Sequence, residues 1–137
     1  MKRRWIIVFI SGSIISLFLF LQFGRDIKAV SSRSHMADNF YEQELTVIAN
    51  TVIIPDKEKF AEDLIQRCID NNFHEIRFSY DMTGYPNRLR ITVYPNEWSR
   101  KCSRDCFTIQ YETDAGCPNH YNIKDDPDRF NLIIENE

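Results

Sequence analysis

The sequence contains little glycine and proline, with four and five of them in 137 residues. This scarcity, together with 13% aromatic residues, argues against a collagen-like or disordered chain. There is also no excess of positive charge, because 17 Lys and Arg stand against 20 Asp and Glu. A nucleic-acid binder needs a basic face toward the phosphates, so the charge argues against nucleic acid as a partner.

The common catalytic and phosphate-binding motifs are absent as well. The chain has no G-x-S-x-G, H-E-x-x-H, P-loop or dinucleotide fingerprint, and no C-x-x-C redox pair. His74 is a candidate general base, but no nucleophile or orienting group accompanies it in a recognisable order. We therefore expect a protein that is not an enzyme and needs no cofactor. The alternative is a small enzyme secreted after signal cleavage.

The clearest positive feature is the uncharged apolar run from Trp5 to Phe23. As a helix it would be about 28 Å long, close to the thickness of the bilayer hydrocarbon. Trp5 stands at one end, where an indole ring suits the membrane interface. The run predicts a transmembrane anchor at residues 5–23, with the lipid bilayer as its partner, after a short head at residues 1–4.

A cleaved signal peptide is the competing interpretation of the same segment. The basic residues before the run would form its n-region, and Ala29-Val30-Ser31 would be the cleavage site. The apolar run is longer than a usual h-region of about 7–15 residues, so we favour a retained anchor. Three basic residues lie on each side of it, and the α-amino group adds to the N-terminal side. We therefore expect a cytoplasmic N-terminus and an extracytoplasmic C-terminal domain.

Charge divides the chain into two parts. Residues 1–30 contain five Lys and Arg against one Asp, a net charge of +4, and the remainder carries −7. Residues 24–39 are polar and show no hydrophobic period, which predicts a tether. Residues 40–137 are long enough for one small domain.

This domain is predicted to be α+β, with one amphipathic helix packed on an antiparallel sheet of about four strands. The helix follows Pro55 and Asp56, where apolar residues recur at helical spacing from Phe60 to Ile69. Alternating residues predict strands at 76–80, 88–93, 107–111 and 131–134, the first two joined as a hairpin by residues 81–87. Before the helix we expect helix into the early forties and then strand to Ile54.

The predicted sheet suggests an interface for a protein partner that the sequence does not identify. One face would be covered by the helix, and the other would carry Arg77, Arg88 and Arg90. Tyr85, at the tip of the predicted hairpin, is an aromatic residue of the kind that anchors interfaces. The expected function is therefore binding or accessory work at the membrane.

Cys102, Cys106, Cys117 and His120 form the sharpest constellation, C-x3-C-x10-C-x2-H. Three sulfurs and an imidazole can bind zinc, which makes a metal- or redox-sensing domain the alternative function. Geometry disfavours this site, because a straight strand after Cys106 would leave it about 10 Å from Cys117. We expect instead no metal and a Cys102–Cys106 disulfide, the kind of bond that forms outside the cytoplasm.

Overall fold

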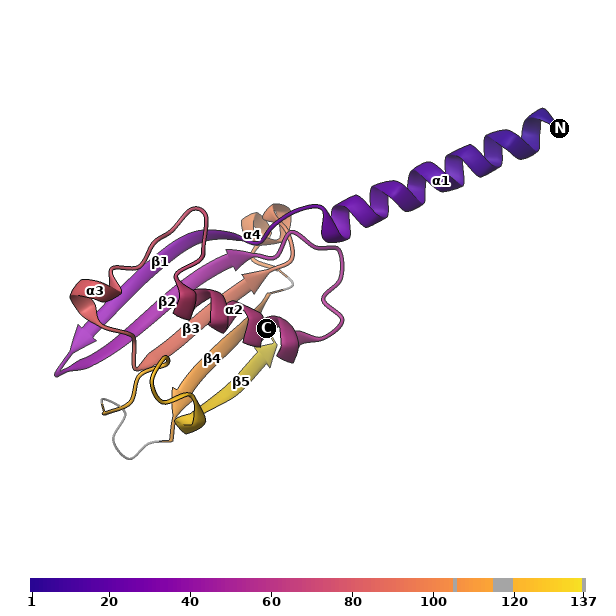
Figure 1. Ribbon diagram of the computed structural model, residues 1–137. Helices are drawn as coiled ribbons and strands as arrows, with labels where there is room; N and C mark the ends of the chain where they lie inside the picture. Colours follow the sequence, from indigo (N-terminus) through magenta and orange to yellow (C-terminus); the bar gives the residue numbers. More distant parts are fainter. Residues whose placement is uncertain (105, 115–119, 137) are drawn as a thin grey trace.

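A computed structural model describes residues 1–104, 106–114 and 120–136. The first helix stands clear of a sheet that is packed against shorter helices (Figure 1). In chain order the elements are α1 (Lys2–Phe23), β1 (Lys28–Ala37), β2 (Phe40–Ile48), α2 (Lys57–Asp70), α3 (Tyr80–Thr83), β3 (Arg88–Tyr94), α4 (Glu97–Cys102), β4 (Phe107–Thr113), η2 (Pro127–Arg129) and β5 (Phe130–Asn136). The predicted α+β class, with an apolar N-terminal helix, is confirmed.

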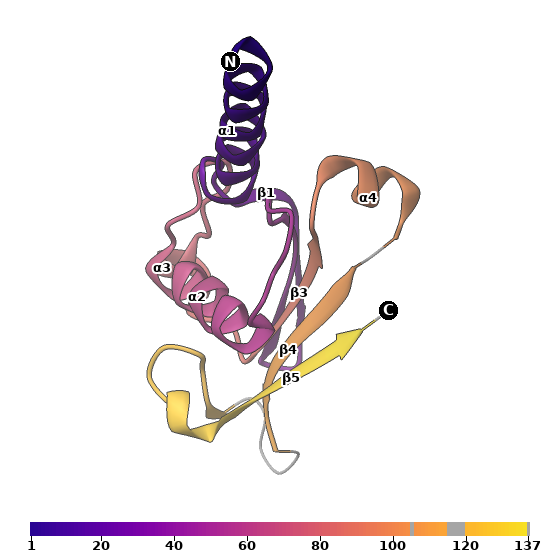
Figure 2. The same cartoon turned by 90° about the vertical axis from the view of Figure 1, so that its right-hand side faces the viewer.

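The sheet has five strands in the order β1-β2-β3-β4-β5, whereas the sequence predicted about four antiparallel ones. It is mixed, because β2 and β3 run parallel and the other neighbours run antiparallel. The parallel pair follows from the connection: α2 carries the chain across one face of the sheet before β3 begins. α2 and α3 lie on one side of the sheet and α4 on the other (Figure 2).

The predicted tether is the first point of correction, since residues 28–37 form β1. They pair with β2 through a two-residue turn at Asp38 and Asn39, which have φ of 48° and 65°. Left-handed backbone at both positions is typical of a type I′ hairpin. β1 lies at the edge of the sheet and most of its side chains are exposed. Backbone hydrogen bonds therefore hold it in the sheet, and its sequence shows no hydrophobic period. Residues 40–48 are strand throughout, not helix, and the strand ends before Ile54.

The predicted hairpin over residues 76–93 is the second correction, because its first strand does not form. Residues 73–79 lie outside helix and strand. The Asn71 side chain binds this segment by donating to the Phe78 carbonyl and accepting from the Phe78 N–H, both at 2.8 Å. Ile76 and Phe78 still pack against the core, so their alternation reflects burial without a strand ladder.

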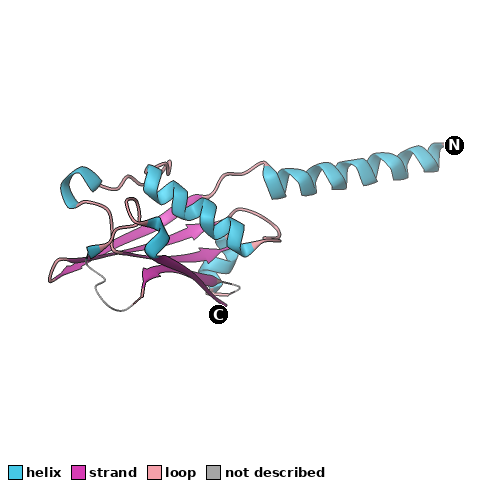
Figure 3. Cartoon of the chain, turned by 60° about the horizontal axis from the view of Figure 1, so that its bottom comes forward, coloured by secondary structure: helices cyan, strands magenta, loops and turns pink. Residues whose placement is uncertain are grey.

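The amphipathic helix is confirmed as α2 and provides the core contact. It begins at Asp56, whose carboxylate accepts from the Lys59 N–H at 3.0 Å, and it ends at Asn71 in left-handed conformation. α2 lies over the sheet (Figure 3), and its buried residues, which join the core cluster, are Ala61, Leu64, Ile65 and Cys68. Burying a leucine of this kind stabilises the fold by about 1.5–3 kcal/mol. The last two predicted strands are present as β4 and β5.

Candidate functional site

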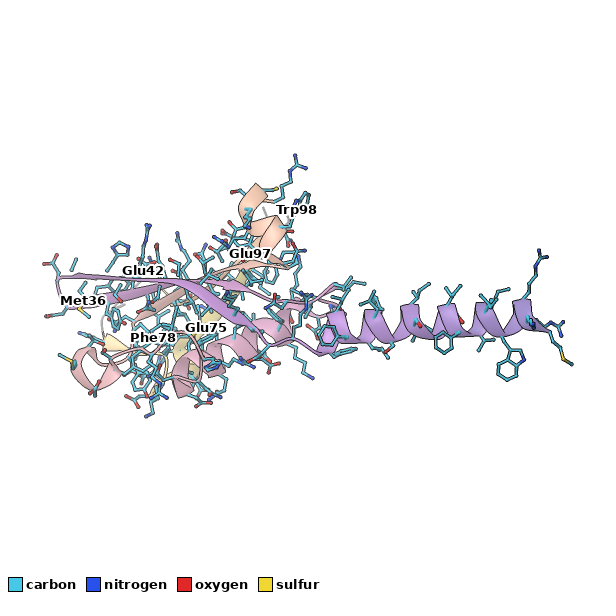
Figure 4. The ribbon with its side chains drawn as sticks, turned by 90° about the horizontal axis from the view of Figure 1, so that it is seen from above. Met36, Glu42, Glu75, Phe78, Glu97 and Trp98 are labelled. Carbon is cyan, nitrogen blue, oxygen red and sulfur yellow. The ribbon has the colours of Figure 1, made fainter. Side chains whose placement is uncertain are left out.

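The side of the sheet away from α2 is the candidate interaction surface, and we call it the open face. The side chains of β2 and β3 alternate, so every second residue is buried under α2 and the residues between them point away. Figure 4 shows Glu42 on this open side and Phe78 on the opposite, helix-covered side. By strand register, its central charged and amide residues are Glu42, Glu44, Arg88, Arg90, Gln110 and Glu112.

Arg88 is neutralised within the open face. Its guanidinium lies 2.6 Å from a Glu112 carboxylate oxygen and 3.8 Å from one of Glu42, and it sits over the Phe40 ring. The three charged side chains come from three adjacent strands and are all partly exposed. Such partly exposed pairs add little stability, but they fix the geometry of this end of the face.

Arg90 differs from Arg88 because none of the described carboxylates pairs with it. It stands opposite Glu44 on β2 and Gln110 on β4. Within the described ranges, no carboxylate lies within 4 Å of its guanidinium, and its covered Nε makes no hydrogen bond. Glu44 is instead 3.7 Å from the exposed His35 imidazole of β1. Arg90 is therefore a half-buried cation that can accept a carboxylate from outside the chain.

Arg77 does not join this face, which corrects the prediction that grouped it with Arg88 and Arg90. It lines a polar cavity of about 320 Å³ together with Asp26, Arg67 and His74. The cause is the missing strand: without a ladder at residues 73–79, the predicted alternation does not continue onto the sheet. In this cavity the Arg67 guanidinium donates to Asp26 at 2.8 Å and holds the pKa of that carboxyl below its usual value.

Tyr85 is likewise not part of the open face. Its ring packs 4.4 Å from the ring of Tyr80, centroid to centroid, and Lys124 lies over it. It belongs to the aromatic group at the edge of the core, on the helix-covered side. Trp98 on α4 and Met82 on α3 are much more exposed, at 63% and 84%.

The cysteines are placed in different environments. Cys68 is buried under α2, and burial raises the pKa of its thiol, which keeps it protonated. Cys102 is a free, exposed thiol at the last residue of α4, whereas Cys106 is buried just before β4. Because Cys102 is a free thiol here, the expected Cys102–Cys106 disulfide is not formed in this structure.

The zinc constellation is described only in part, because Cys117 lies outside the described residues. Among the residues with described positions, no group of three or more His, Cys, Asp or Glu side chains is arranged to hold a metal ion. His120 is exposed beyond β4. The metal- or redox-sensing alternative thus stays a prediction.

The sequence did not reveal the acidic members of the open face or the residues that join α1 to the domain. Glu42, Glu44 and Glu112 come together through the β2–β3 and β3–β4 registers, which no local pattern records. Gln22 was visible as the single amide in the apolar run, and this was the one available signal of a contact at its end.

No family model, curated protein or solved structure matches the chain.

Proposed function

We propose that the chain is a single-pass membrane protein whose extracytoplasmic domain binds a protein partner through the open face. The anchor is supported by α1, a 22-residue helix that is long and apolar enough to cross a membrane and has no buried residue. A signal sequence would meet the same test of length and composition. The length of the run, beyond that of a usual signal peptide, favours retention.

The proposed orientation is supported by the basic residues that directly precede the apolar run, Lys2, Arg3 and Arg4. This cluster favours the cytoplasmic side, where positive charge is retained. The acidic domain then lies on the outside, with its exposed Cys102 in an oxidising environment.

The observation that carries the binding role is that Arg90, in the middle of the open face, pairs with none of the carboxylates whose positions are described. A guanidinium held between neighbouring strands is preorganised, since the sheet fixes its backbone and Glu44 and Gln110 flank it. A partner that places a carboxylate there gains a charge-assisted hydrogen bond at little cost in ordering. Arg88 and its two glutamates then form the neighbouring polar rim of the interface.

Site-specific photocrosslinking in cells tests this proposal. A photoreactive residue replaces Gln110 on the open face, and a matched control replaces Glu62 on the exposed side of α2. We expect an adduct of discrete mass from position 110 and none from position 62. Adding Arg90→Glu should reduce the adduct by at least about tenfold, because reversing a charge opposite a carboxylate costs about 2 kcal/mol or more. Equal adducts from both positions, or an adduct indifferent to Arg90→Glu, would contradict the proposal.

A further inference from the structure

The end of α1 is fixed to the domain by specific hydrogen bonds. The Gln22 Oε1 accepts from the N–H groups of Val52 and Ile53 at 2.9 and 3.0 Å, and its Nε2 donates to the Ile53 carbonyl at 2.7 Å. A second contact lies beside this one, where the Asn50 side chain donates to the Asp26 carbonyl at 2.8 Å. The loop between β2 and α2 is therefore held against the last turn of α1.

These contacts determine the depth of the loop relative to a membrane that α1 crosses. Gln22 is the penultimate residue of the apolar run, so it lies at the boundary between hydrocarbon and headgroups. Atoms within hydrogen-bond distance of its amide lie at nearly the same depth. Yet this loop exposes two aliphatic side chains, Val52 at 46% and Ile53 at 58%. Exposed aliphatic groups at that depth are positioned to enter the interface.

α4 extends the same end of the domain. It lies at the end of the sheet from which α1 leaves (Figure 1), and Trp98 is exposed there (Figure 4). The strand register agrees, because Lys28 at the start of β1 and Tyr94 at the end of β3, just before α4, both stand beside Ile48 of β2. Glu97 is paired with Arg100, and within the described part of the chain Lys101 has no carboxylate partner. An indole with a nearby lysine is well suited to anionic headgroups.

We propose that this end of the domain, formed by Val52, Ile53, Trp98 and Lys101, docks on the headgroup region of the bilayer. The inference rests on the proposed membrane anchor and adds a second, superficial membrane contact. Because α1 continues roughly along the direction of the strands (Figures 1 and 4), docking holds the sheet upright. The open face then points sideways, along the membrane surface, toward a neighbouring membrane protein.

The composition of the chain offers a direct test, since Trp5 and Trp98 are its two tryptophans. Trp5→Phe leaves Trp98 as the sole indole in the full chain. The variant is reconstituted in phosphatidylcholine vesicles containing phosphatidylglycerol, with lipids brominated near the headgroup as quenchers. We expect Trp98 emission to be quenched by these lipids and to be several-fold less accessible to aqueous acrylamide than an exposed reporter. Trp98 that is quenched by acrylamide and unaffected by bromolipid would overturn the docking.

A matched reporter lies at the opposite end of the domain. Met82 is 84% exposed on α3, which is far from α1 in the structure (Figure 1). Met82→Trp in a background of Trp5→Phe and Trp98→Phe should be quenched by acrylamide and unaffected by bromolipid. Quenching of this reporter by lipid would contradict an upright domain.

Two further variants separate docking from anchoring. Val52→Ser with Ile53→Ser, in the Trp5→Phe chain, should weaken lipid quenching of Trp98 while the chain stays in the vesicles; unchanged quenching would overturn the role of the loop. Trp98→Phe leaves Trp5 to report on α1. Bromolipid quenching of Trp5 without quenching of Trp98 refutes only the docking. If neither indole is quenched, the proposed anchor itself is refuted.

Discussion

The two faces of the sheet come from the same strands but differ in what covers them. Leu89 and Ile91 of β3 are fully buried beneath α2, while the intervening Arg90 lies on a face without a covering helix over its centre. The backbone ladder is shared, so the difference lies in the side chains and in what they contact. The helix-covered face therefore holds the fold together, and the open face is the one that we propose for a partner.

The largest contrast should appear in thiol reactivity. Cys68 is buried under α2 with a raised pKa, whereas Cys102 is exposed on α4. Modification of Cys68 requires opening of the core, which typically costs 5 kcal/mol or more, so we expect it to be slower than Cys102 by a factor of about 10³ or greater. Alkylation followed by mass spectrometry of the peptides measures both rates. Comparable rates would show that α2 does not seal this face.

Leu64→Ala should lower the free energy of unfolding by about 2–5 kcal/mol, because it leaves a cavity between α2 and the sheet. Urea unfolding of the full chain in detergent, followed by circular dichroism, provides the measurement. The exposed Glu62 of the same helix is the matched control. Glu62→Ala should change stability by no more than about 0.5 kcal/mol, and equal losses in the two variants would be incompatible with the division.

Gln43→Leu should cost about 1–3 kcal/mol, since it removes the buried amide that binds the buried Tyr41 hydroxyl and two serine hydroxyls of β1. The fully buried amide donates to Ser32 at 2.6 Å and accepts from the hydroxyl groups of Ser34 and Tyr41. It thereby ties β1 to β2 on the helix-covered side. Gln110→Leu, on the open face, serves as the control and should have a much smaller effect in the same unfolding experiment. A neutral Gln43→Leu would mean that this network does not hold the edge strand.

Arg88→Met should lower the free energy of unfolding by about 0.2–1 kcal/mol, as expected for partly exposed ion pairs. Part of the wild-type advantage should disappear at high salt, where charges are screened. Arg90→Met should cost less, because no carboxylate pairs with Arg90 among the described residues. Unfolding at two salt concentrations distinguishes the variants. A larger loss of unfolding free energy for Arg90→Met than for Arg88→Met would show that Arg90 stabilises the fold.

The smallest effect concerns acid stability at Asp26. Its folded-state pKa is lowered by Arg67, so its contribution is present above the unfolded pKa and is lost as pH falls through the folded value. We expect a slight loss of stability below about pH 4 that Asp26→Asn removes. The effect is small because the carboxyl is largely exposed. If the stability of the wild type and of Asp26→Asn falls equally at acid pH, the Asp26–Arg67 pair has no role in acid stability.

The sequence predicted the elements whose burial follows a regular period. α2 has an apolar stripe, and Leu89 to Val93 alternate, which is why Arg88 and Arg90 were placed on the same side. β1 escaped prediction because an edge strand with exposed side chains leaves only its backbone to record the pairing. Ile76 and Phe78 caused the opposite error, because they alternate like strand residues but form no strand. The Asn71 side-chain amide binds the backbone there in place of a neighbouring strand.

The candidate site could be predicted only in part for a related reason. Its arginines belong to one strand, but Glu42 and Glu112, which pair with Arg88, come from neighbouring strands that long connections separate from it. The parallel pairing of β2 with β3 depends on how α2 crosses the sheet, and no local residue pattern encodes that register. The cavity around Arg77 depends equally on distant segments, from Asp26 to His74.

Membrane extraction combined with surface labelling tests whether α1 anchors the chain with its domain outside the cell. Intact cells producing the full chain are treated with a membrane-impermeant maleimide, and the membranes are then washed with alkaline carbonate. We expect a chain of intact mass in the washed membranes, labelled at Cys102. A labelled chain that lacks its first thirty residues and is found in the soluble fraction would contradict it, as would an intact chain that reacts only after the cells are opened.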